Sequence, residues 1–151
     1  MIAAVTLPEI PILGVITGML AAVVMLVLVR FLGGTVEQLQ QVALLGWPRD
    51  PEAITPAHAI TGFVLIGGLG GLVFVLIVPA MGFIADRGIP PSSAAAGLVA
   101  AAIFVLYVEI GGRLDRDDPP EIRMRSAWFV GAAAYALVLL LGFELFADWF
   151  I

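Results

Sequence analysis

The stretch "GFVLIGGLGGLVFVLIVP", residues 62–79, places a cluster of glycines inside an apolar run of bilayer-crossing length. A hydrocarbon core about 30 Å thick needs about 20 apolar helical residues. A phosphate-binding glycine loop normally joins a strand to a helix and carries Lys, whereas this chain contains no Lys. An irregular loop at that depth would also leave backbone groups unpaired in lipid. The stretch therefore predicts a membrane-spanning helix whose glycines form a packing surface.

The composition of the whole chain favours lipid as the solvent. Of the 151 residues, 62% are hydrophobic and 13% are charged. Soluble domains are usually about 45–50% apolar and about 25% charged. We therefore expect one integral membrane domain over residues 1–151.

Several classes of function are disfavoured by residues that the chain lacks. There is no Cys and only one His, His58, so a thiolate site or a multi-histidine metal site within one chain is excluded. Ser residues have no His–Asp set to activate them, and no metalloprotease or hydrolase motif is present. A net charge of −5 argues against nucleic acid as a partner. We expect a protein that is not an enzyme and has no cofactor.

Four apolar runs predict an all-α, polytopic membrane protein built as a bundle of four transmembrane helices. Their flanks carry Pro, Gly and charged residues, as helix ends do. In the second run, Pro79 predicts a kink near Val75, because proline removes one backbone hydrogen bond. The expected spans are residues 10–32, 59–85, 93–110 and 127–146.

The distribution of Arg predicts the orientation of these spans. Loops rich in Arg tend to remain cytoplasmic. Six of the seven basic residues lie in or beside the first and third loops, and Arg87 alone lies on the opposite side. We therefore expect a plasma-membrane protein with cytoplasmic first and third loops and both termini outside. The six are Arg30, Arg49, Arg113, Arg116, Arg123 and Arg125.

The first loop contains a short segment with helical periodicity. In "TVEQLQQVALL", residues 35–45, apolar side chains recur at helical spacing and Thr35 is a plausible N-cap. This pattern predicts a short amphipathic cytoplasmic helix. It would lie on the membrane surface with Trp47 at head-group level, or it would cover the end of the bundle.

Small residues recur at intervals of four in the expected spans. Gly67 and Gly71 form a GxxxG pair, Gly14 and Gly18 form a second, and Gly131 begins a run of small residues in the fourth span. Small side chains let helices approach closely in lipid. The third span opens with the small residues 94–97, "AAAG", so every span carries such a patch. We therefore expect some patches to meet a second copy of the chain or another membrane subunit.

Few ionisable residues lie in or near the spans, and each is a candidate for a functional polar site. Glu109 is expected to pair with Arg30 or Arg113 at the inner interface, as a structural ion pair or as a proton or cation site. Glu144 lies near the outer end of the fourth span. His58 follows Pro56 at the start of the second span, where it has the place of a capping or interfacial residue rather than a ligand.

Two families offer points of comparison. Small multidrug resistance transporters also have four short spans, but they depend on a carboxylate deep in the first span, and this chain has no acid from Ile10 to Phe31. The Gly- and Ala-rich spans, the exclusive use of Arg and the sequence "DRDDPP" resemble uncharacterised small four-span membrane proteins of haloarchaea. That resemblance implies a high-salt source and brings no known activity.

The leading hypothesis is a non-enzymatic multi-pass membrane protein that acts through helix–helix association. It would be an accessory or assembly subunit of a membrane complex, such as a respiratory complex. The alternative is a small transporter or channel formed by an oligomer, for which only Thr17, Thr61 and glycine backbone offer a polar path.

Overall fold

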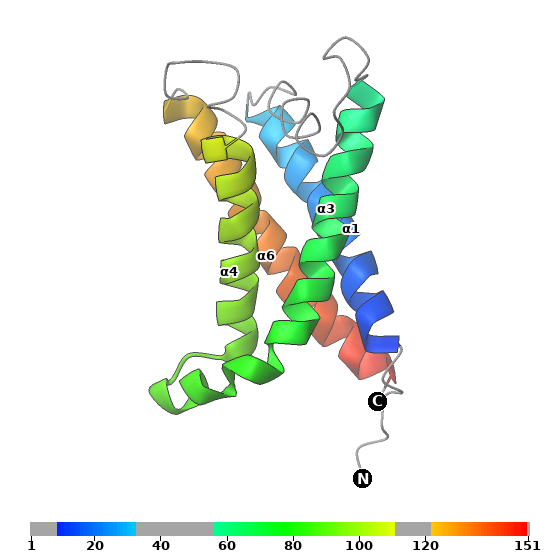
Figure 1. Ribbon diagram of the computed structural model, residues 1–151, viewed down its shortest axis with the longest axis vertical. Helices are drawn as coiled ribbons and strands as arrows, with labels where there is room; N and C mark the ends of the chain where they lie inside the picture. The colour runs from blue at the N-terminus through cyan, green and yellow to red at the C-terminus, as the bar shows by residue number, and fades with distance from the viewer. Residues whose placement is uncertain (1–8, 33–55, 111–121, 151) are drawn as a thin grey trace.

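The computed structural model describes residues 9–32, 56–110 and 122–150, and four long helices run up and down through it (Figure 1). Each provides a segment long and apolar enough to cross a membrane, the third one with the π-helical residues Val105–Ile110 that continue it, as expected for a multi-pass membrane protein. The expectation of an all-α four-helix bundle is confirmed. The helices are α1 (Glu9–Phe31), α3 (Pro56–Ile77), α4 (Pro91–Phe104) and α6 (Ile122–Phe150).

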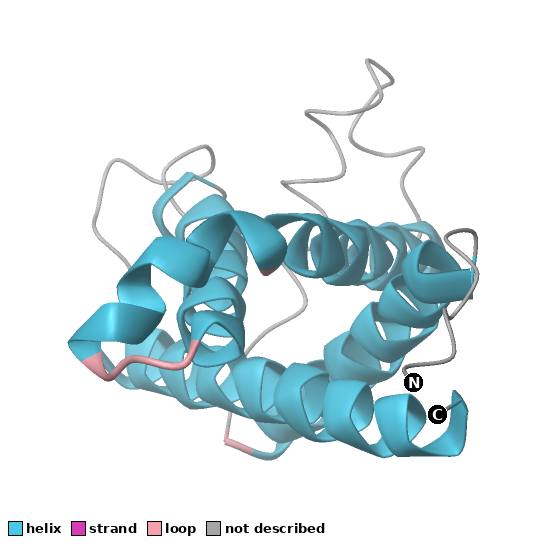
Figure 2. Ribbon diagram, turned by 90° about the horizontal axis from the view of Figure 1, so that it is seen from below, coloured by secondary structure: helices cyan, strands magenta, loops and turns pink. Residues whose placement is uncertain are grey.

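The helices form a four-sided arrangement around one core (Figure 2). Helix α1 packs against α3 and α6, and α4 packs against the same two helices from the opposite side. The closest pairing is between α1 and α3. Since consecutive helices run in opposite directions, every neighbouring pair is antiparallel (Figure 1).

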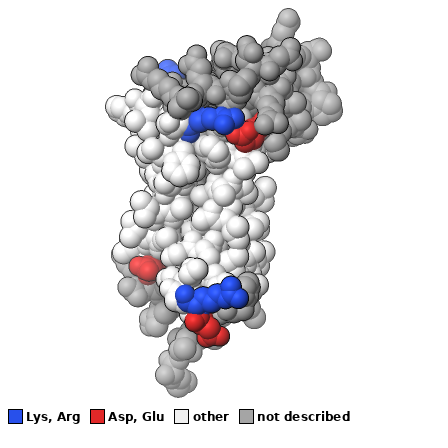
Figure 3. Space-filling view, turned by 90° about the vertical axis from the view of Figure 1, so that its left-hand side faces the viewer, with Lys and Arg blue, Asp and Glu red and all other residues white. Residues whose placement is uncertain are grey.

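Large side chains of α1, α3, η3 (Val105–Ile110) and α6 fill the core together with smaller residues of α4, while apolar side chains also cover the outside. Exposed Leu, Val and Ile surround the bundle, as a surface in contact with lipid requires. Charged side chains leave an uncharged belt between the two ends (Figure 3). The largest fully buried side chains are Trp128, Tyr107, Tyr135, Phe63, Phe74, Met25 and Leu139.

Helix α3 ends earlier than the sequence indicates. It stops at Ile77, and the segment Pro79–Arg87 forms a separate 3-10 helix, η2, so residues 78–85 do not continue the second span. Pro79 has no N–H to donate to the carbonyl of Val75, and the next backbone bond joins Met81 N to Val78 O at 3.1 Å. The chain thus leaves the bundle axis (Figure 1) rather than kinking within one span. Gly88, with φ of 77°, ends the segment.

The third span changes helix type before its end. Helix α4 gives way to a π-helical turn, η3 (Val105–Ile110). A π turn holds more residues per turn than an α turn, so it shifts the face on which later side chains lie. Tyr107 and Val108 are consecutive, and both are buried. The same shift places Glu109 at the α4–α6 edge, where it meets α6.

Some expectations fall on parts of the chain outside the described residues. These are the amphipathic helix at residues 35–45, Trp47 and Arg113.

Candidate functional site

The closest approach of two backbones is where α1 crosses α3, and glycines make it. Gly14 and Gly18 on α1 lie against Gly67 and Gly71 on α3. A Cβ atom added to Gly14 would lie 2.7 Å from the carbonyl oxygen of Gly71, and one added to Gly67 would lie 2.9 Å from the carbonyl oxygen of Gly18. Real Cβ atoms do not come so close to backbone, so no larger residue fits without separating the helices.

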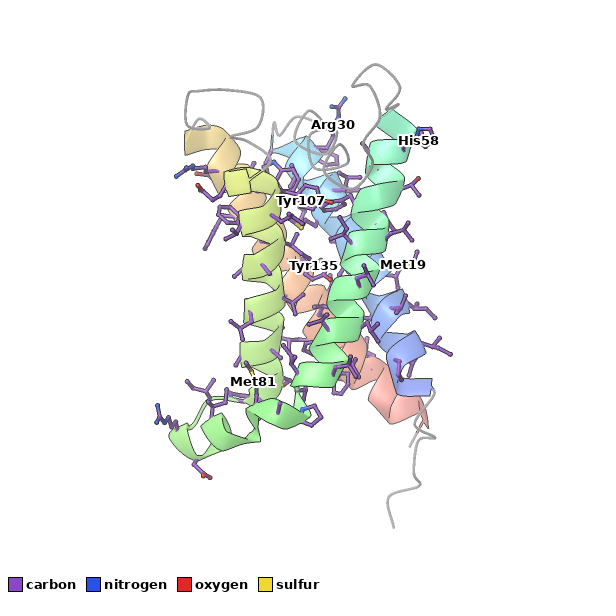
Figure 4. All side chains as sticks on the ribbon, viewed as in Figure 1. Met19, Arg30, His58, Met81, Tyr107 and Tyr135 are labelled. Atoms are coloured by element: carbon purple, nitrogen blue, oxygen red, sulfur yellow. The ribbon has the colours of Figure 1, made fainter. Side chains whose placement is uncertain are left out.

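The same glycine run also meets the opposite helix. Tyr135 on α6 reaches across the bundle and donates a buried hydrogen bond of 2.6 Å from its hydroxyl to the carbonyl oxygen of Gly67. A Cβ on Gly70 would lie 2.5 Å from that hydroxyl oxygen and 3.0 Å from Val99 Cγ1 on α4. Figure 4 shows Tyr135 near the middle of the bundle. The glycines of α3 therefore contact all three other helices.

Gly131 serves the α1–α6 contact. Its added Cβ would lie 2.7 Å from Val29 Cγ2 and 3.1 Å from Met25 Cγ, both on α1. Gly142 occupies an equivalent place near the other end of α6, where its Cβ would meet the side chain of Thr17. Thr17 is buried. The side chain of Thr17 and the hydroxyl of Tyr135, both polar groups inside the bundle, are thus packed against glycines of a neighbouring helix.

An aromatic cluster fills the core near the end of the bundle that carries Arg30 and His58 (Figure 4). The rings of Tyr107 and Trp128 are stacked, with centroids 5.6 Å apart and an interplanar angle of 8°. Phe63 meets both edge-on, at 4.9 Å from Tyr107 and 6.0 Å from Trp128. The Nε1 donor of Trp128 is buried and finds no acceptor within the described part of the chain. These rings tie α3, η3 and α6 together.

Glu109 forms an ion pair at the same end, and its partner is Arg125 of α6. The Oε1 atom of Glu109 lies 3.0 Å from Nη2 of Arg125. The sequence predicts Arg113, at i+4, or Arg30, at the same end of the bundle, as the partner of Glu109, and Arg113 lies outside the described residues. This prediction missed Arg125 because only the packing of η3 against α6 brings it to Glu109. Arg125 lies two residues before the fourth apolar run, residues 127–146, but nothing in the sequence singles it out from the other Arg residues at that end as the partner of Glu109.

The remaining candidates lie at the two ends of the bundle. Arg30, in the last turn of α1, and His58, in the first turn of α3, are exposed at one end (Figure 4). Glu144 is exposed on α6, towards the other end. Of the candidates, Glu109 is in direct contact with a charged side chain that was not among them, Arg125.

The fold and these contacts define a class: a multi-pass membrane protein whose four helices are closely packed through glycine. Comparison with protein families, characterised proteins and solved structures finds no match to this chain. Its function therefore has to be argued from its own surfaces.

Proposed function

We propose that this chain is a non-enzymatic membrane protein that acts by binding other membrane helices, as an accessory or assembly subunit of a membrane complex. The supporting observation is the outward face of α4. Ser93, Gly97 and Ala101 follow one another at intervals of four, and all three are exposed. Residues at this spacing stack on one face of a helix.

Gly97 of α4 differs from the glycines at the α1–α3 contact in having open space beside it. A Cβ atom on Gly97 would meet nothing within 4 Å. Gly14, Gly18, Gly67 and Gly71 are already occupied by contacts within the chain. Glycine in a helix interior destabilises it by about 0.5–1 kcal/mol relative to Ala. A helix from a second polypeptide fitting over Gly97 would offset that loss through close packing.

Substitution of Gly97 tests this proposal. Gly97→Leu should leave the chain folded, since the site is open, but should block close approach of another helix. The measurement is the mass of the tagged protein and its copurifying subunits after mild detergent extraction from its native membrane. Gly62→Leu is the matched control, because Gly62 on α3 also has nothing within 4 Å.

The proposal predicts a larger assembly for the parent and for Gly62→Leu, and its loss in Gly97→Leu. A parent chain that is recovered alone as a monomer would refute association. An assembly that survives Gly97→Leu would place the contact elsewhere than α4.

A transporter or channel formed by an oligomer is the second candidate. Within the described residues, the bundle axis is filled by Met25, Tyr135 and Leu139, all fully buried. A path through one chain would require these side chains to move, so the path would have to run between chains. Solute flux in reconstituted vesicles that is abolished by Gly97→Leu and retained in Gly62→Leu would support this candidate over a purely accessory role.

A further inference from the structure

Two contacts bridge α4 with η3 to α6 on the outer edge of the bundle, one above the other. The first is the Glu109–Arg125 ion pair. The second is an edge-to-face contact between Phe104 and Phe129, with centroids 6.1 Å apart and an interplanar angle of 87°. Phe129 follows Arg125 by four residues on α6, and Glu109 follows Phe104 by about one π turn. The ion pair therefore lies one turn nearer the end of the bundle than the aromatic pair.

The ion pair lies at the ends of two segments that are long and apolar enough to cross a membrane. Glu109 is the last residue of Pro91–Glu109, and Arg125 is the first of Arg125–Leu145. In a bilayer, we expect the ends of such segments to lie among the head groups, and the aromatic pair inside them to lie beside the acyl chains. Figure 3, which views the α4 side, shows oppositely charged side chains together above the uncharged belt.

Both contacts are open to the surroundings of the bundle. The side chain of Arg125 is 40% exposed, and Phe129 is 65% exposed. Glu109 accepts from Nη2 of Arg125, while Nε of Arg125 is buried with no acceptor among the described residues. A guanidinium carries five donors and binds phosphate through two of them at once. Because Nε is buried, an anion that binds Arg125 has to approach the exposed part of the guanidinium beside Glu109.

We propose that this edge binds one phospholipid molecule, with its phosphate on the Arg125 guanidinium and its acyl chains against Phe104 and Phe129. Basic side chains between transmembrane helices at the membrane boundary recognise lipid head groups in this way. The Phe104–Phe129 pair, one turn nearer the middle of the bundle, would contact acyl chains, so the site should prefer a phospholipid to free phosphate. Phe104 follows Gly97 by seven residues and so lies on the same side of α4, about two turns nearer the ion pair. The proposed lipid site does not rest on the proposed association, because its contacts with α6 are made within one chain.

The proposal predicts that substitutions of Glu109 and Arg125 change the affinity for phospholipid in opposite directions. The Glu109 carboxylate occupies one edge of the guanidinium and repels phosphate. Glu109→Gln should therefore strengthen phospholipid binding, whereas Arg125→Gln should weaken it. If the pair served only to hold η3 against α6, the two substitutions would act in the same direction.

The test is native mass spectrometry of the purified full chain in detergent with three probes. Phosphatidylglycerol carries both phosphate and chains, diacylglycerol has chains alone, and glycerol 3-phosphate has phosphate alone. Only phosphatidylglycerol should bind strongly. Arg125→Gln should weaken its binding by about tenfold, the factor that corresponds to one lost charge-assisted contact. Arg87→Gln at the opposite end of the bundle is the matched control and should bind as the parent does.

Phe129→Ala keeps the proposal testable if Arg125→Gln does not fold, because Phe129 faces outward and its loss spares the core. It should also weaken binding of phosphatidylglycerol. Equal binding of diacylglycerol, unchanged binding in both Arg125→Gln and Phe129→Ala, or weaker binding in Glu109→Gln would each overturn the proposal. Strong binding of glycerol 3-phosphate would show a phosphate site without lipid and would overturn it as well.

Discussion

Tyr135 joins two helices that are otherwise diagonal to each other in the bundle. Its hydroxyl donates to Gly67 O, and the space that the hydroxyl fills exists because residue 70 has no side chain. Gly67 and Gly70 thus have different roles three residues apart. The missing side chain of Gly67 allows α1 to approach α3 closely, and that of Gly70 leaves space for the hydroxyl of Tyr135.

Removal of the Tyr135 hydroxyl should weaken the bundle modestly. Tyr135→Phe keeps the ring and loses one buried hydrogen bond, which in membrane proteins contributes about 0.6 kcal/mol on average and up to about 1.7. The measurement is the free energy of unfolding in mixed micelles. Leu141→Val, at a lipid-facing position of the same helix, is the control and should change stability by less than about 0.5 kcal/mol. Equal stability of Tyr135→Phe and the parent would mean that the bond contributes nothing.

A double-mutant cycle should show that Gly70 and Tyr135 are coupled. In Gly70→Ala, the new methyl group would lie 2.5 Å from the hydroxyl oxygen of Tyr135, so the hydroxyl has to move and its bond to Gly67 is lost. In the Tyr135→Phe background there is no hydroxyl to displace, and Gly70→Ala should cost less. Contacting pairs show coupling of about 0.5–3 kcal/mol. Additive effects of the two substitutions would contradict the contact.

At the scale of the helices, one residue type has opposite roles at different positions. Gly18 and Gly71 lie where the backbones of α1 and α3 touch, whereas Gly62 and Gly97 have no neighbour within 4 Å. Spacing in the sequence does not distinguish these cases, since all four lie in apolar runs. The partner helix alone decides which glycine is essential to the fold.

Alanine substitution should separate the two groups. In Gly18→Ala, the new Cβ would lie 2.8 Å from Gly71 N, and in Gly71→Ala it would lie 2.8 Å from Gly18 Cα. Since backbone cannot yield locally, each should destabilise the bundle by about 1–3 kcal/mol, the usual range for overpacking. Gly62→Ala and Gly97→Ala should be neutral or stabilising by up to about 1 kcal/mol through helix propensity. Unfolding in mixed micelles measures all four, and equal effects would refute this account of the α1–α3 contact.

The sequence predicts the helices better than it predicts their ends and contacts. Apolar length and the absence of charge place all four spans, because the thickness of the bilayer dictates both. The end of α3 at Ile77 was missed because residues 78–85 are apolar too, and only the lost proline hydrogen bond stops the helix. The π turn at residues 105–110 has no signal in the local sequence, and the ring contacts that Tyr107 makes from it, with Phe63 and Trp128, involve three separate segments.

The candidate site follows the same pattern. Glu109 could be singled out from the sequence, because it is the one charged residue within the third apolar run, residues 93–110. Its partner Arg125 could not, since the two residues meet only through the geometry of η3 and α6. Nothing in the sequence distinguishes Phe104 and Phe129 from the many other apolar side chains of this chain. They belong to the candidate site because they lie one turn from the ion pair.

At the scale of the whole molecule, the two ends of the bundle differ in charge. Arg30 and Arg125 lie at one end with His58, and η2 carries Arg87 and Asp86 at the other. Six of the seven basic residues of the sequence flank the first and third loops. Cytoplasmic loops carry the excess of Arg and Lys in membrane proteins, so this asymmetry predicts that η2 faces outwards.

Labelling of introduced cysteines tests this orientation without background, because the natural chain has no Cys. In intact cells, a membrane-impermeant maleimide should label Asp86→Cys, which lies on η2, and should label Gln40→Cys, in the first loop, only after the membrane is permeabilised. Leu69→Cys, on the lipid-facing side of α3, should remain unlabelled in both conditions and serves as the control. The reverse pattern would place the Arg-rich end outside. It would also move the phospholipid site on Arg125 from the inner to the outer leaflet, so the same three variants decide which leaflet supplies the lipid.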